Sequence, residues 1–124
     1  MAGMIFTAVS GNEANLTLLQ GKTLGSEIIW GGSATPIDVT GFSARLTIRA
    51  NYNSANPTAD FTVANGRVIV GGVDGRIRFV MSAAQSSELV APFTGVYEVE
   101  ITDTAGKVYR AVYGTATIEP EVVK

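Results

Sequence analysis

The sequence predicts an all-β protein, an antiparallel β-sandwich (immunoglobulin-like or jelly-roll-like) with one short helix near residues 83–89. The first observation is composition: the 124 residues include 14 Val, 9 Ile and 13 Thr against 6 Leu, and β-branched side chains suit a pleated, half-buried surface. The second is the spacing of turn signals, which separate short apolar runs at about 8–12 residues, as in sandwiches and barrels. The third is the alternation of apolar and polar residues within those runs.

Three short strands are predicted before the first glycine pair. They are MIFTAV (4–9), ANLTLL (14–19) and SEIIW (26–30), each rich in apolar residues. Trp30 is expected to anchor the core before the chain breaks at Gly31 and Gly32. We expect two parts in the chain: an N-terminal arm or extra strand at residues 1–15, and a single β-sandwich domain at residues 16–124.

The middle of the chain has the clearest alternation. In FSARLTIR (42–49) the residues predicted to face the core are Phe42, Ala44, Leu46 and Ile48. Asn65-Gly66 lies between two β-rich runs and predicts a hairpin with a type I′ turn, which needs positive φ at both central residues. Asp74-Gly75 predicts a second reversal, so the three strands around these turns should form a meander. In the last of them, Ile77, Phe79 and Met81 should point to one face.

The pattern then changes to a helical one and back. Ser82 and Gln85 have the spacing of a capping box, which predicts a short helix from about Ala83 to Leu89, ending before Pro92. A second hairpin follows, with its turn at Asp103–Gly106. In its first strand, Tyr97, Val99 and Ile101 are predicted to face the core. In the final run, TATIEPEVV, Ala116 and Ile118 should share one face.

Composition excludes several classes of function. The chain has no Cys and no His, so a Ser-His-Asp hydrolase, a thiolate metal site and a cysteine nucleophile are all excluded. The net charge of −2, without a run of like charge, does not fit a nucleic-acid binder, and no window is apolar enough for a membrane span. Glu98 and Glu100 share one strand face, but we expect a solvated pair rather than a glycosidase acid and base. We therefore predict no catalytic residue, metal or cofactor.

Several short motifs follow one another along residues 18–123. They are QGKTL (20–24), Trp30, PIDVTGFSARLTIR (36–49), DGRIRFVMSAAQSSEL (74–89) and the segment 95–123, which ends in EPEVV. In this order and spacing the chain resembles the small β-sandwich virion proteins encoded among the tail, baseplate and fibre genes of tailed bacteriophages. The pattern is similar to that of the N-terminal domain of the lactococcal phage upper baseplate protein. Residues 1 to about 15 extend beyond the usual start of that pattern.

The resemblance implies a non-enzymatic virion protein of the tail, baseplate or fibre-attachment region. Its expected partners are other phage structural proteins and further copies of itself in a symmetric homo-oligomer. An extra apolar strand at the N-terminus can add to a neighbouring subunit's sheet edge. The candidate partner-binding residues are Met4, Ile5, Phe6, Tyr52 and Phe93.

Two other functions remain open. A capsid decoration (cement) protein would also use a compact sandwich with an N-terminal arm. A carbohydrate-binding module for host recognition would need exposed aromatic side chains, for which Tyr52, Phe93 and Trp30 are the candidates.

Overall fold

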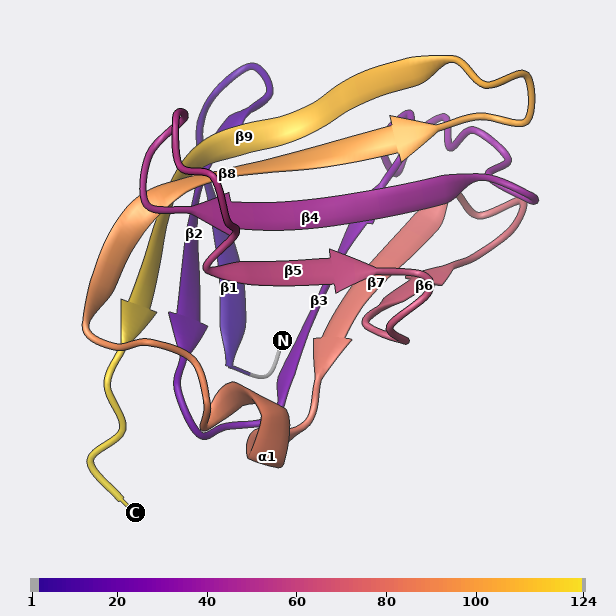
Figure 1. The fold of residues 1–124 in the computed structure, drawn as a ribbon. Coiled ribbons are helices and arrows are strands. Elements are labelled where there is room, and N and C mark those ends of the chain that lie inside the picture. Colours follow the sequence, from indigo (N-terminus) through magenta and orange to yellow (C-terminus); the bar gives the residue numbers. More distant parts are fainter. Residues whose placement is uncertain (1–2, 124) are drawn as a thin grey trace.

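The computed structural model describes residues 3–123 as two packed β-sheets with one short helix, which confirms the predicted all-β sandwich (Figure 1). The elements, in chain order, are β1 (Met4–Ser10), β2 (Glu13–Leu19), β3 (Leu24–Ile29), β4 (Ser43–Arg49), β5 (Ala59–Thr62), β6 (Val68–Val70), β7 (Arg76–Met81), α1 (Ala83–Ser86), β8 (Phe93–Thr102) and β9 (Val108–Glu119).

The larger sheet joins the beginning of the chain to its end. Its six strands lie in the order β1-β2-β9-β8-β4-β5, and the smaller sheet has the order β3-β7-β6. All pairings between these strands are antiparallel except β2 with β9, where Leu16 lies opposite Ala116 in a parallel ladder. β2, the second strand of the chain, and β9, its final strand, are therefore neighbours in one sheet, although most of the sequence separates them.

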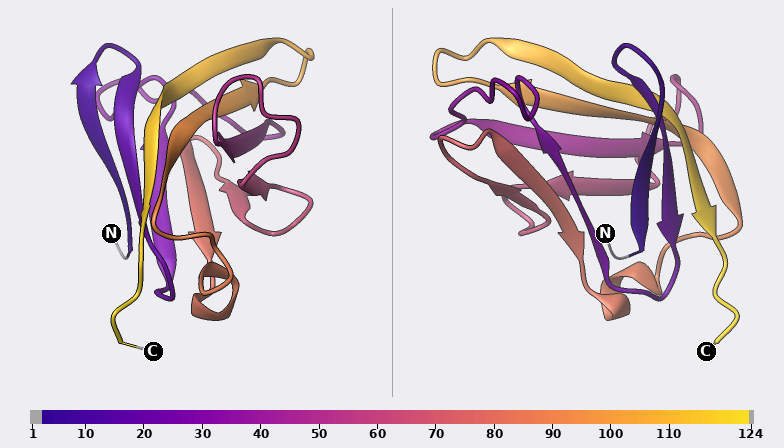
Figure 2. Two further views of the ribbon diagram at one scale, coloured as in Figure 1. Left: turned by 60° about the vertical axis from the view of Figure 1, so that its left-hand side comes forward. Right: turned by 180° about the vertical axis from the view of Figure 1, so that it is seen from behind.

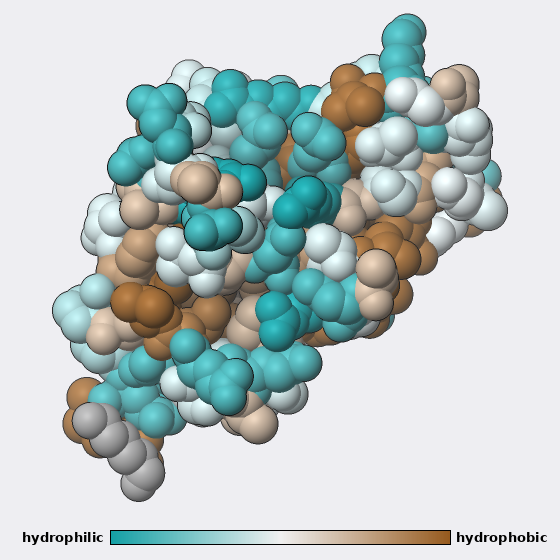
Figure 3. All heavy atoms as spheres, viewed as in Figure 1, coloured by the Kyte–Doolittle hydropathy of each residue, from teal (hydrophilic) through white to brown (hydrophobic). Residues whose placement is uncertain are grey.

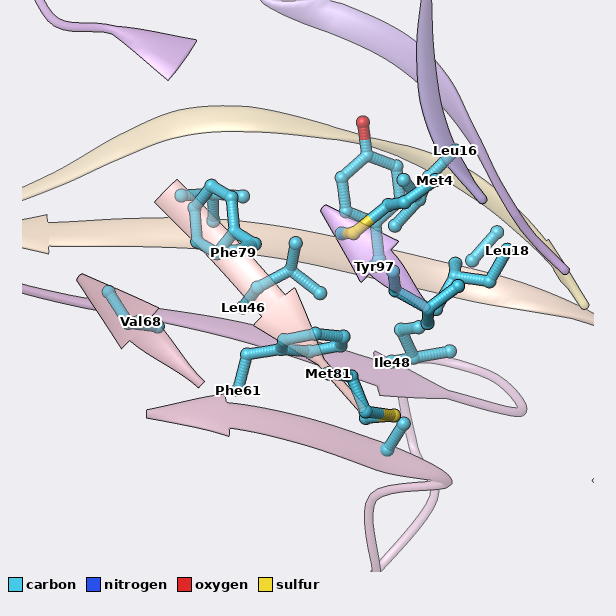
Figure 4. Packing of buried hydrophobic residues seen from close by; sticks show 14 of the residues in the cluster. Met4, Leu16, Leu18, Leu46, Ile48, Phe61, Val68, Phe79, Met81 and Tyr97 are labelled. Carbon is cyan, nitrogen blue, oxygen red and sulfur yellow. The ribbon is translucent and has the colours of Figure 1, made fainter. Parts of the chain in front are cut away.

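The core lies between the two sheets, and its members are the residues that alternation assigns to the inner faces. Leu46 and Ile48 on β4, Val99 on β8, and Phe79 on β7 have no exposed surface. Figure 4 shows the side chains of both sheets meeting in this layer. The ring centroids of Phe61 and Phe79 lie 6.4 Å apart at an interplanar angle of 87°, an edge-to-face geometry that aromatic pairs favour. Burial of these faces is what holds the sheets together.

The hairpin at Asp103–Gly106 and the cap of the helix are as predicted. Gly106 donates its N–H to the carbonyl oxygen of Asp103, closing the turn between β8 and β9. Ser82 and Gln85 form the reciprocal capping box at the start of α1. The helix ends at Ser86, however, before the predicted Leu89. From there the N–H groups bond three residues back, as from Leu89 to Ser86, because a single helical turn readily tightens at its end.

The reversal at Asn65-Gly66 exists, but the predicted type I′ turn is wrong. Of the two central residues of the turn, only Gly66 has a positive φ, of 78°. Every described residue with a positive φ is a glycine, so Asn65 does not adopt the left-handed conformation. Asn65 instead uses its side chain: its Oδ1 accepts hydrogen bonds from the N–H groups of Thr62 and Arg67, at 3.0 and 3.1 Å. An amide that bonds to nearby backbone in this way holds the turn without a left-handed asparagine.

The predicted three-strand meander is also wrong. β5 belongs to the larger sheet and pairs with β4, whereas β6 and β7 belong to the smaller sheet. The turn at Asn65-Gly66 therefore crosses between the sheets. This arrangement lets Phe61 on β5 and Val68 on β6 face the same core from opposite sides, which in-plane pairing of the two strands would prevent.

Residues 3–15 are part of the sandwich. β1 pairs with β2 in the larger sheet, and the domain division expected at residue 15 falls within β2. Gly3 also forms a single parallel bridge with Gly25, at the start of β3. Beyond this bridge β1 and β3 spread apart along their length (Figures 1 and 2). The chain segment expected as an arm or extra strand is thus the edge strand of its own sheet.

Residues of the motifs that carry the resemblance hold loops in place. Gln20 donates its side-chain N–H to the carbonyl oxygen of Leu89 at 2.8 Å and accepts the N–H of Glu121 at 3.0 Å. Asp38 accepts both the N–H and the hydroxyl of Thr40. The Gln20 bonds join segments far apart in the sequence, whereas the Asp38–Thr40 bonds hold a single loop. Gln20, Asp38 and Thr40 thus have a structural role.

Candidate functional site

The edge strands of the two sheets differ in how well they are protected from pairing with another chain. Native edges are commonly short or carry a charge or a proline. β5 contains Asp60, β3 contains Glu27, and β6 has three residues. β1 has seven residues, MIFTAVS, with no charge and no proline. Among the edge strands within residues 3–123, β1 alone has none of these protections.

The outer side of β1 is open along most of the strand. Ile5 and Val9 point away from the core and are 51% and 55% exposed. Leu19 donates its N–H to Gly3, and the β1–β2 register makes Ile5 and Thr7 the next hydrogen-bonded positions. In an antiparallel pair the alternate residues turn their backbone groups outward. The N–H and C=O groups of Phe6 and Ala8 therefore face away from β2.

The five predicted partner-binding residues do not form one surface. Met4 is buried in the core, so its side chain cannot meet a partner in this fold. Phe6 is half-buried, with its ring centroid 6.1 Å from that of Phe79. Phe93 is half-buried against the core cluster as well. Only Ile5, on β1, and Tyr52, in the β4–β5 loop, are substantially exposed, and they belong to separate regions.

Tyr52 lines a groove on the outer face of the larger sheet. The groove has a volume of about 260 Å³ and is bordered by side chains of β4, β8 and the β4–β5 loop, among them Arg45, Arg49, Tyr52, Val96, Glu98 and Glu100. Figure 3, which has β4 and β5 toward the reader, shows mainly hydrophilic side chains on this face. The register across β4 and β8 explains the gathering, because Arg45 lies opposite Glu100 and Arg49 lies opposite Val96.

Ion pairs fix the positions of the charged groups around the groove. Arg45 donates two hydrogen bonds to the carboxylate of Asp60, at 2.9 and 2.6 Å, and Thr47 donates a third at 2.9 Å. Partial burial raises the pKa of Asp60, but the hydrogen bonds from Arg45 and Thr47 outweigh it and hold that pKa below its usual value. Glu98 is paired with Arg110 at 2.7 Å. Arg45 therefore pairs with Asp60 on β5, although Glu100 lies opposite it on β8.

Glu98 and Glu100 lie together on the groove, as their spacing predicts, but in different surroundings. The side chain of Glu98 is 44% exposed and forms an ion pair with Arg110. Glu100 is exposed and forms no ion pair within residues 3–123. A general acid needs a desolvated carboxyl, whereas these two suit hydrogen bonding to a polar ligand.

Sequence reasoning missed four groove residues: Arg45, Thr47, Arg49 and Val96. Alternation places Arg45 and Arg49 on the outer face of β4, but it does not say which strand lies beside β4. The signal that would find the groove is the pairing of β4 with β8, which is a tertiary property.

Within residues 3–123, no group of three or more acidic side chains is placed to hold a metal ion. No helix of that part of the chain has the length and apolar character that crossing a membrane requires. Neither a protein-family model nor a curated protein matches the sequence.

Proposed function

We propose that this chain is a non-enzymatic structural protein of a tailed-phage virion, located in the tail, baseplate or fibre-attachment region. The observation that carries the proposal is the unprotected edge of β1, a seven-residue strand without charge or proline. An edge of this kind accepts a strand from another chain through main-chain hydrogen bonds. The order of motifs along residues 18–123 supports a phage origin.

The same edge supports assembly with further copies of this chain and with other phage structural proteins. The outward backbone groups of Phe6 and Ala8 supply the donors and acceptors, and the exposed side chains of Ile5 and Val9 supply apolar contact area. Because β1 carries no charge, two copies can approach edge to edge without repulsion. A two-fold axis through such a contact gives a closed, symmetric homodimer.

Location in the particle is tested by immunogold labelling of purified phage particles from the strain that encodes this chain. Label at the tail or its tip is the expected result. Label spread over the head would replace the tail assignment with the capsid decoration alternative. Particles that contain none of the protein, whether intact or disrupted, would overturn the virion role.

The role of β1 is tested by two matched lysine substitutions. Val9→Lys places a charge on the open edge, and Val73→Lys places the same charge on an exposed valine in the β6–β7 turn. Incorporation into particles should fall about tenfold for Val9→Lys, the ratio that corresponds to ~1.4 kcal/mol, and should not change for Val73→Lys. Ala8→Pro removes an outward N–H while leaving the β1–β2 bonds intact, and should act like Val9→Lys. Equal incorporation of all the variants would exclude β1 as the docking edge.

A further inference from the structure

The β4–β5 loop, residues 50–58, holds an exposed aromatic ring beside the groove described above. Tyr52 is 69% exposed, the largest exposure of any aromatic side chain among the exposed hydrophobic residues. The loop sequence around it, ANYNSANPT, contains three Asn and one Ser. This composition is typical of recognition loops, where Tyr gives contact area and Asn and Ser give hydrogen bonds.

The loop is held in one conformation by its own hydrogen bonds. Arg49 extends from the end of β4 and donates to the carbonyl oxygens of Ser54 and Ala55, at 3.1 and 3.4 Å. Asn51 donates its N–H to the Ser54 hydroxyl oxygen at 3.1 Å and accepts the N–H of Asn53 at 3.0 Å. None of these bonds uses the Tyr52 side chain. The loop that carries the Tyr52 ring is therefore already ordered before a ligand binds, which lowers the entropic cost of binding.

The charges of the groove balance. Its lining contains two guanidinium groups, of Arg45 and Arg49, and two carboxylates, of Glu98 and Glu100. An equal number of fixed positive and negative charges gives no net attraction for an ion. It does give strong donors and acceptors for a neutral ligand with many hydroxyl groups, because hydrogen bonds to charged groups are the stronger ones. The Glu100 carboxylate, which has no ion-pair partner in residues 3–123, is the acceptor most available to such a ligand.

We propose that this groove binds a neutral saccharide. A pyranose ring has an apolar C–H face, which fits the Tyr52 ring and the Val96 floor, and hydroxyl groups at its rim, which fit Glu98, Glu100 and the β4 arginines. At about 260 Å³ the groove is slightly smaller than the ~300 Å³ where small-molecule pockets begin, so it accommodates a terminal sugar unit rather than a long chain. The groove is separate from the β1 edge, so the saccharide proposal does not depend on the assembly role.

The test is a titration of the full-length, ¹⁵N-labelled chain with glucose, galactose, rhamnose and N-acetylglucosamine, followed by amide NMR signals. Inorganic phosphate serves as the anionic comparison. At least one of the sugars should give saturable shifts at Thr47, Tyr52, Val96 and Glu100, and phosphate should not. Absence of saturable shifts with all four sugars, or shifts centred elsewhere, would overturn the proposal. So would tighter binding of phosphate at these positions, or broadening of the groove signals that depends on protein concentration alone, which would assign the groove to a second copy.

Three variants separate the contributions. Tyr52→Ala should weaken sugar binding at least about tenfold, whereas Tyr52→Phe, which keeps the ring, should bind within about threefold of the wild type. Glu100→Gln removes the free carboxylate and should also weaken binding. Val73→Ala, at an exposed position in the β6–β7 turn, is the matched control and should bind as the wild type does. If Tyr52→Ala binds sugar unchanged while its spectrum remains that of the folded protein, the inference is wrong.

Discussion

The phenol of Tyr97 on β8 passes beneath β9 and donates a hydrogen bond to the carbonyl oxygen of Ala14 on β2, at 2.7 Å. Tyr97 lies opposite Gly114 in the β8–β9 ladder. A side chain on Gly114 would meet the same Ala14 oxygen, since a Cβ there would lie 2.1 Å from it. Because Gly114 has no side chain, there is room for the hydrogen bond between Tyr97 and Ala14. β8, β9 and β2 are joined at this point. Figure 4 shows the Tyr97 ring beside Met4 and Leu16.

Tyr97→Phe should lower the free energy of unfolding by about 1–3 kcal/mol, because it leaves the Ala14 carbonyl oxygen buried without this partner. Urea unfolding followed by circular dichroism measures the change. Burial raises the pKa of the Tyr97 phenol well above its ordinary value, so the unfolded chain releases this proton at lower pH than the folded one. The stability advantage of wild type over Tyr97→Phe should therefore be constant below about pH 10 and shrink above it. An advantage that grows with pH would contradict this assignment.

Gly114→Ala should be more damaging than Tyr97→Phe. The added methyl group collides with backbone rather than with a movable side chain, and Gly114 has a φ of 155°. A loss of about 3 kcal/mol or more is expected from overpacking at a fixed site. Gly25→Ala on β3 is the matched control, since no atom lies within 4 Å of a Cβ built there. Similar unfolding midpoints for the two alanine variants would show that the approach of β2 to Gly114 is looser than described.

Asp60 should contribute to the acid sensitivity of the fold. Its pKa is lowered by the hydrogen bonds from Arg45 and Thr47, which outweigh the effect of burial. A carboxyl whose folded pKa is depressed stabilises the protein above its unfolded pKa, and that contribution is lost as pH falls through the folded value. Wild type should therefore lose more stability than Asp60→Asn as the pH falls from about 5 to about 2. Parallel stability curves for the two proteins in urea titrations across this range would argue against the Arg45–Asp60 pair as a stabilising contact.

Gln20→Ala should destabilise the end of the sandwich where α1 lies. The side chain joins the loop after the helix, at Leu89, to the segment after β9, at Glu121. Loss of both partly buried hydrogen bonds should cost about 1–3 kcal/mol. Gln20→Glu retains the acceptor for the Glu121 N–H but loses the donor to Leu89, so its unfolding free energy should fall between those of wild type and Gln20→Ala. An exchange rate of the Glu121 amide that is the same in all three proteins would contradict this role.

Local sequence patterns predicted which side chains of each strand face the core. The assignment of strands to sheets depends on tertiary pairing, which these patterns do not predict. Alternation in residues 42–49 identifies Ala44, Leu46 and Ile48 as core because side chains on a strand alternate between its two faces. The same rule cannot assign β5 and β6 to different sheets. Two alternating strands joined by a tight turn look alike in sequence whether they pair with each other or face each other across a core.

The candidate surfaces were predictable only in part. Tyr52 was predicted as a candidate partner or carbohydrate contact, and Glu98 and Glu100 as a solvated pair on one strand face. Only the pairing of β4 with β8 brings the three residues to one groove. The apolar stretch at Met4–Phe6 was expected to reach a neighbour with all three side chains. Because β1 is a strand of its own sheet, every second side chain turns inward, which buries Met4 and leaves Ile5 exposed.

The parallel pairing of β2 with β9 has a consequence for how the protein is made. On the ribosome, the β1–β2 hairpin emerges long before β9, its partner in the sheet. Until β9 is released, the edge of β2 has no strand beside it, and Ala14 lacks the Tyr97 phenol for most of synthesis. Closure of the larger sheet must therefore wait for nearly the whole chain, and contacts so distant in sequence make for slow folding. A nascent chain halted before β9 would carry an open strand on each side of the missing position.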